Sequence, residues 1–186
     1  MWLSVSSFVA TVLLCSVLQL PPLKSTEGLS YFGNLHETIF VYGLGLTATS
    51  YFLLLFCQRL KSFGNQVSDT FRIGLQIVAL ALLGIVATPS DSSLTLIKDL
   101  HVTAGLAIFI LQAGLSLNYL IRVKNTAVDW FLLGLQLLAI AVAGLSFHRV
   151  GVLELMLPAQ FLAVSAFFAL LIRAVNHRAA ELAAKP

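Results

Sequence analysis

The sequence predicts an all-α, polytopic membrane protein whose six transmembrane helices form one bundle with short loops. Composition supports this class, because 59% of the 186 residues are hydrophobic, only 10% are charged, and the mean hydropathy is +0.94. Soluble domains carry about a quarter charged residues, and a soluble fold of this length cannot bury so much apolar surface. A further observation is the length of the apolar runs, since about 20 apolar residues are needed to cross the hydrocarbon core.

Six apolar runs have about this length. The predicted spans are residues 2–20, 35–57, 71–88, 96–121, 128–147 and 152–174. The first run could be a cleaved signal, but it lacks a positively charged n-region and is longer than a usual h-region, so we expect a retained helix. No connection is long enough for a soluble domain. We therefore expect residues 1–186 to form a single transmembrane bundle, integral to a membrane and multi-pass.

The distribution of basic residues predicts the orientation, because short cytoplasmic loops are enriched in Lys and Arg. Of the 11 basic residues, eight fall on the side that holds both termini: Arg59, Lys61, Arg72, Arg122, Lys124, Arg173, Arg178 and Lys185. Lys24, Lys98 and Arg149 fall on the other side. Both termini are therefore expected in the cytoplasm. The net charge of +3 is then a topology signal and does not indicate nucleic-acid binding.

Small and polar residues within the spans are expected to hold the helices together, because apolar contact alone gives little stability in lipid. The small residues expected at close helix contacts are Gly43, Gly45, Thr47, Thr49, Ser50, Gly105, Gly114, Gly134, Ala141 and Gly144. Four spans each contain one glutamine: Gln76, Gln112, Gln136 and Gln160. An amide in hydrocarbon needs a partner, so these side chains are expected to face the bundle interior. Hydrogen bonding between helices is the simpler interpretation, and a polar pathway for a substrate or proton is the alternative.

Ionisable residues gather at the span ends that are predicted to face away from the cytoplasm. Residues 96–110, LIKDLHVTAGLAIFI, carry Lys98, Asp99 and His101 at the entrance of a span. His101 lies at helical spacing from Gln112 and is expected to point inward, whereas Asp99 projects from a different side. The candidate ligand-binding residues at this outer face are His36, Glu37, Asp99, His101, His148, Arg149, Glu154 and Gln160.

Three interpretations of this outer-face cluster are open. It can be purely structural, because polar side chains cost little at helix ends that reach water. It can bind a lipid headgroup or a membrane-protein partner under the outer loops, and this is the function we expect. It can also hold zinc or a b-type haem through His36, His101 and His148, as in a redox or hydrolytic membrane protein. No HxxxH or HExxH motif places two ligands on one helix face, so we expect no cofactor and assign no catalytic residue.

A family pattern lies in residues 74–120, GLQIVALALLGIVATPSDSSLTLIKDLHVTAGLAIFILQAGLSLNYL. A glycine-bearing span ends in a short outer loop, and a histidine then opens the next span, followed by small residues and a phenylalanine. The residues at these places are Gly84, Ala87, His101, Ala104, Gly105 and Phe109. The pattern resembles the six-span family of the damage-regulated autophagy modulators and of the protein that remodels fatty acids on GPI anchors, together with small bacterial relatives. The first outer loop does not reproduce the Ser-Asp-bearing stretch expected of that family. The resemblance implies a non-catalytic or lipid-handling membrane protein and carries over only His101.

Overall fold

The structure, a computed structural model, describes residues 1–21, 28–61, 69–89, 93–122, 125–147 and 155–183. Its regular elements are helices: α1 (Trp2–Leu18), η1 (Gly28–Ser30), α2 (Tyr31–Asn34), α3 (Ile39–Lys61), α4 (Asp69–Ala87), α5 (Thr95–Arg122), α6 (Ala127–Phe147) and α7 (Met156–Ala183). Within the described ranges, the five helices α3 to α7 are long and apolar enough to cross a membrane, and α1 is a shorter apolar helix of 17 residues. The prediction of an all-helical bundle suited to a membrane is confirmed.

The start of α3 and the end of α7 differ clearly from the predicted spans. The second span was expected to begin at residue 35, but α3 begins at Ile39, because Leu35 is extended and Thr38 turns back to donate its hydroxyl to the carbonyl of Phe32 at 2.6 Å. The last span was expected to end at residue 174, but α7 continues to Ala183. Residues 178–183, RAAELA, are all good helix formers, so the helix continues beyond the apolar run.

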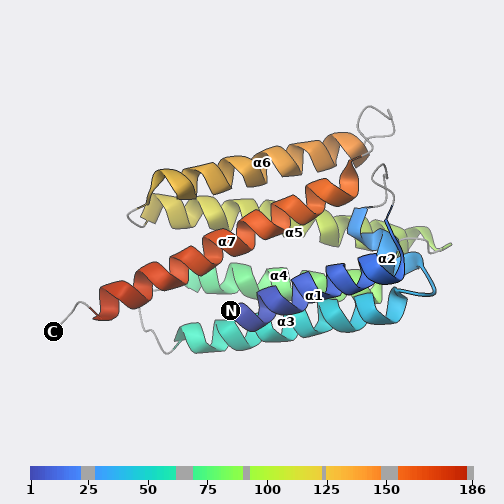
Figure 1. Cartoon of the computed structure of the whole chain (residues 1–186), viewed down its shortest axis with the longest axis horizontal. Coiled ribbons are helices and arrows are strands. Elements are labelled where there is room, and N and C mark those ends of the chain that lie inside the picture. The colour runs from blue at the N-terminus through green and yellow to red at the C-terminus, as the bar shows by residue number, and fades with distance from the viewer. Residues whose placement is uncertain (22–27, 62–68, 90–92, 123–124, 148–154, 184–186) are drawn as a thin grey trace.

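The long helices run alternately up and down, with α5 and α6 on one side of the bundle and α1, α3 and α4 on the other (Figure 1). Helix α7 crosses diagonally between these two groups and packs on α6, α5 and η1. The remaining close neighbours are α1 with α3, α3 with α4, and α4 with α5. We call the end where α2 lies, with the ends of α1, α4 and α6 and the starts of α3, α5 and α7, the α2 end. The other is the opposite end.

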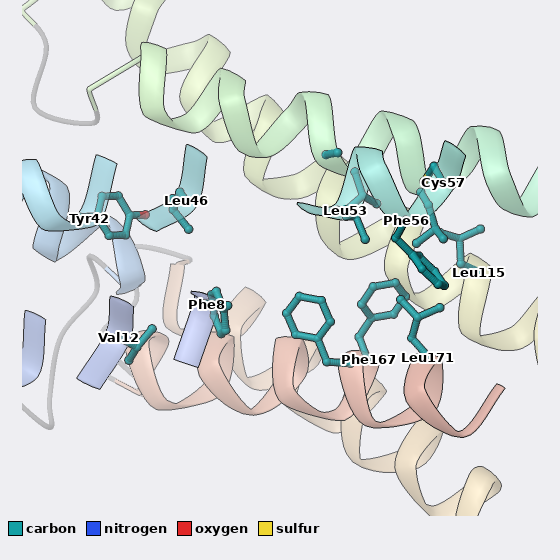
Figure 2. Close-up of a cluster of buried hydrophobic side chains, with 14 of the residues drawn as sticks. Phe8, Val12, Tyr42, Leu46, Leu53, Phe56, Cys57, Leu115, Phe167 and Leu171 are labelled. Atoms are coloured by element: carbon teal, nitrogen blue, oxygen red, sulfur yellow. The ribbon is translucent and has the colours of Figure 1, made fainter. Parts of the chain in front are cut away.

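The main core lies where α1, α3, α4, α5 and α7 meet (Figure 2). Leu115 of α5 and Phe167 and Leu171 of α7 converge there on Phe56 of α3. Large apolar side chains also cover the outside of the bundle, as at Phe40, which is 73% exposed. An apolar exterior around an apolar core is what a bilayer as solvent requires.

Small residues bring α1 close to α3. The hydroxyl of Ser4 donates to the carbonyl of Thr49 at 3.1 Å, and that of Ser7 donates to the carbonyl of Gly45 at 3.3 Å. A Cβ added at Gly45 would overlap the side chain of Thr11. Close backbone approach with hydroxyl-to-carbonyl bonds is the usual way in which helices associate in lipid.

Four other glycines do not make the close contacts expected of them. Within the described residues, a Cβ added at Gly105, Gly114, Gly134 or Gly144 would meet no other atom within 4 Å. The expectation that these four glycines lie at close contacts between helices of the same chain is therefore wrong. In helices that are apolar on all sides, the sequence does not show which face packs and which face meets lipid.

Candidate functional site

His101 lies in the second turn of α5, at the α2 end, with a half-buried side chain. Its Nδ1 donates a hydrogen bond to the carbonyl oxygen of Thr88 at 2.5 Å. Thr88 is itself held by its hydroxyl, which donates to the carbonyl of Gly84 at 2.6 Å. Because a carbonyl oxygen only accepts, Nδ1 carries a proton, and Nε2 remains available to a ligand. The end of α4 thus fixes the orientation of the imidazole.

The first turns of α5 combine charged and apolar exposed side chains. Lys98 is exposed and precedes His101 by three residues, so the two side chains lie next to each other on the helix surface. Asp99 is exposed on the same turn. Leu96 and Leu100 are 72% and 51% exposed, which continues the apolar exterior up to this point. The ammonium of Lys98 and the oriented imidazole of His101 therefore lie where the apolar surface of the bundle ends.

The remaining predicted site residues are only partly described. His36 and Glu37 are exposed in the turn that precedes α3. His148, Arg149 and Glu154 lie outside the described residues. Within the part of the chain that the structure describes, no group of three His, Cys, Asp or Glu side chains is placed to hold a metal ion. A zinc or haem site of His36, His101 and His148 stays a prediction, since one of its members is not described.

Gln160 binds a neighbouring part of the chain. Its side-chain oxygen accepts a hydrogen bond from the backbone N–H of Leu29 at 2.7 Å. The adjacent Gly28 has a φ of +64°, and a Cβ there would lie 2.4 Å from that same oxygen. Gln160 therefore holds η1 against the start of α7, and this contact is possible because glycine readily adopts the left-handed conformation and has no Cβ.

At the opposite end, α6 and α7 are joined by a polar cluster that the sequence analysis missed. Asp129 is fully buried, and its Oδ1 accepts a hydrogen bond from Nε of Arg173 at 2.5 Å. Its Oδ2 accepts from the backbone N–H and the hydroxyl of Thr126, both at 2.8 Å. Nη2 of Arg173 donates to the same hydroxyl at 3.0 Å. The available signal was Thr126-x-x-Asp129, which is the pattern of a capped helix start.

Gln112 and Gln136 face the interior, as expected, with exposures of 3% and 0%. Gln76 is only half-buried. These glutamines lie away from both ends of their helices, so they belong neither to the His101 site nor to the Asp129 cluster.

No protein-family model, no curated protein and no solved structure matches this chain. The resemblance to the six-span family, drawn from residues 74–120, therefore stays a prediction. The function is argued from the site alone.

Proposed function

We propose that this multi-pass membrane protein recognises a membrane lipid through its headgroup, with His101 and Lys98 at the α2 end as the binding residues. The observation that carries the proposal is the oriented, half-buried imidazole of His101 next to an exposed ammonium. Both groups belong to the first two turns of α5, where the apolar exterior ends.

A phosphate is the headgroup component that this arrangement suits best. The ammonium of Lys98 supplies a positive charge, and Nε2 of His101 supplies a second donor in the form of the ring in which both nitrogens carry protons. The start of α5 adds the partial positive charge of a helix N-terminus. A phospholipid presents its phosphate at the same boundary between water and hydrocarbon, so no separate recruitment step is needed.

Six spans with both termini in the cytoplasm form part of the proposal. Helix α1 is 17 residues long, about 25 Å by helix geometry, which is near the lower limit for a span. Its bonds from Ser4 to Thr49 and from Ser7 to Gly45 support an antiparallel placement along α3. With six spans the charge distribution puts the α2 end, and therefore His101, outside the cytoplasm.

The test is a titration of the purified chain with phosphatidylglycerol, followed by native mass spectrometry. Lys98→Gln and His101→Ala should each weaken binding about tenfold, or about 1.4 kcal/mol, since a hydrogen bond to a charged group contributes about 1.5–3 kcal/mol. Asp99→Asn is the matched control from the same turn. It removes a negative charge and should leave binding unchanged or slightly tighter.

A further variant separates binding from folding at His101. His101→Asn keeps an N–H donor that can reach the carbonyl of Thr88 but removes Nε2. It should retain the thermal unfolding midpoint of the wild type and still lose lipid affinity. Unchanged affinity in both Lys98→Gln and His101→Asn would contradict the proposal, and loss of folded protein only in His101→Ala would assign the histidine to structure.

A further inference from the structure

Three buried polar side chains of α5 and α6 carry polar atoms for which the described residues provide no hydrogen bond. Gln112, Ser116 and Gln136 are 3%, 3% and 0% exposed. Among the described residues, no partner reaches Oε1 of Gln112, Oγ of Ser116, or either polar atom of the Gln136 amide. Four buried polar atoms are thus left without a bond in the middle of an apolar bundle.

Helix geometry places the two glutamines at the same depth. Gln112 comes ten residues before the end of α5 and Gln136 nine residues after the start of α6, so each lies about 14–15 Å from the opposite end. Asp129 of α6 contacts Arg173 of α7. Because these helices run antiparallel, Gln136 lies near the level of Ala166, two turns before Arg173.

Helix α7 has two buried alanines near this level. Ala163 and Ala166 are 0% and 3% exposed, so they are packed inside the bundle without filling much of it. Ser116 follows Gln112 by one turn and lies on the same side of α5. Gln136 of α6 therefore lies at the level of alanines of α7, which offer its amide no side-chain hydrogen bond.

Ser116 also lines a small cavity of about 10 Å³ between α4, α5 and α7. Its other walls include Leu115, Phe167 and Leu171, which Figure 2 shows converging in the core. This volume is at the lower limit for one water molecule. The surface of this cavity is apolar, and the cavity shows that packing beside Ser116 is incomplete.

We infer that Gln112, Ser116 and Gln136 form an internal water-binding site between α5, α6 and α7. A buried polar atom without a bond is destabilising, so four of them would remove a large part of the stability of a typical domain. Buried waters usually make about three hydrogen bonds to groups of this kind. The competing arrangement is a direct bond between the two glutamine amides, and the experiment must distinguish the two.

The experiment measures magnetisation transfer from water to glutamine side-chain amides by NMR, with ¹⁵N-glutamine-labelled full-length protein in nanodiscs of deuterated lipid. The Gln112 and Gln136 amides, assigned by single Met substitutions, should show cross-relaxation with bound water. A direct contact between the two amides without any water signal would overturn the inference, and so would the absence of both signals.

Matched variants test whether the three residues act together. Gln136→Leu should abolish the water signal at Gln112, because a shared water loses its partner. Gln58→Leu replaces an exposed glutamine of α3 and should leave that signal unchanged. Ser116→Ala removes only a hydroxyl, so it replaces Gln136→Leu as the test variant if Gln136→Leu does not fold. It should weaken the water signal at Gln112. A Gln112 water signal of unchanged strength in Ser116→Ala and Gln136→Leu would refute a shared site.

Discussion

The hydrogen-bond partners of individual polar residues decide which of them can bind a ligand. His101 and Gln160 were both predicted site residues at the same end of the bundle. The amide oxygen of Gln160 is bonded to the backbone of Leu29, whereas His101 is held through Nδ1 and keeps Nε2. Two residues at the same end of the bundle therefore differ in what they can do. Gln160 stabilises the fold, whereas His101 is oriented by the fold and keeps one ring nitrogen for a ligand.

The buried carboxylate of Asp129 makes a prediction at this scale. Arg173→Gln should lower the free energy of unfolding by about 2–3 kcal/mol, somewhat less than for a fully buried pair, because it leaves a buried charge without its cation. The side chain of Arg173 is 34% exposed, so water compensates part of the loss. Unfolding in detergent measured for both proteins checks the value.

A double-mutant cycle provides the control for this prediction. Asp129→Asn removes the charge, so adding Arg173→Gln to it should cost much less than Arg173→Gln costs alone. Equal costs in both backgrounds would show that the pair contributes nothing to stability.

At the scale of helices, four glycines illustrate two cases with opposite expected effects. Gly45 and Gly74 lie at close contacts, where an added Cβ would overlap Thr11 or Leu115. Gly114 and Gly134 face open space. Only the first group limits how closely two helices of one chain approach each other.

Two glycines of α3 allow a matched test. Gly45→Ala should destabilise the protein by about 1–3 kcal/mol, because the methyl group forces α1 and α3 apart. Gly43→Ala should be neutral or stabilising by up to about 1 kcal/mol, since its Cβ would have only an ordinary contact with Val86 at 3.8 Å. Thermal unfolding of the two variants checks the difference, and equal midpoints would contradict the close contact.

The helices themselves could be predicted from the sequence, but their packing faces could not. Runs of about 20 apolar residues are sufficient to identify spans, and this held for α3 to α7. The buried face is not encoded in the same way, because lipid and core are both apolar and the helices carry no strong polar side. The bond from Asp129 to Arg173 joins residues 44 positions apart, and only the packing of α6 on α7 brings them together.

For the molecule as a whole, the central feature is that α7 contacts both groups of helices. It contributes Phe167 to the core with α1 and α3, and Leu170 to a second cluster with Tyr119 and Leu133. Loss of α7 packing would therefore separate the α5–α6 side of the bundle from the rest.

The proposed orientation of the molecule leads to a labelling prediction. In a background with Cys15→Ala and Cys57→Ala, a cysteine at Ser93 should react with a membrane-impermeant maleimide in intact cells. A cysteine at Ala127 should react only after the cells are permeabilised, because the two exposed positions lie at opposite ends of the bundle. The reverse pattern would place His101 in the cytoplasm.

Helices α5 and α7 are longer than the thickness of a typical hydrocarbon layer. Each has 28 residues and extends about 42 Å, whereas the hydrocarbon layer is about 30 Å thick. Such helices tilt or project beyond the lipid, and a thinner bilayer requires more of either. Because His101 lies near the start of α5, a change in tilt moves its ring relative to the phosphate layer, so bilayers of different thickness would present this residue at different depths.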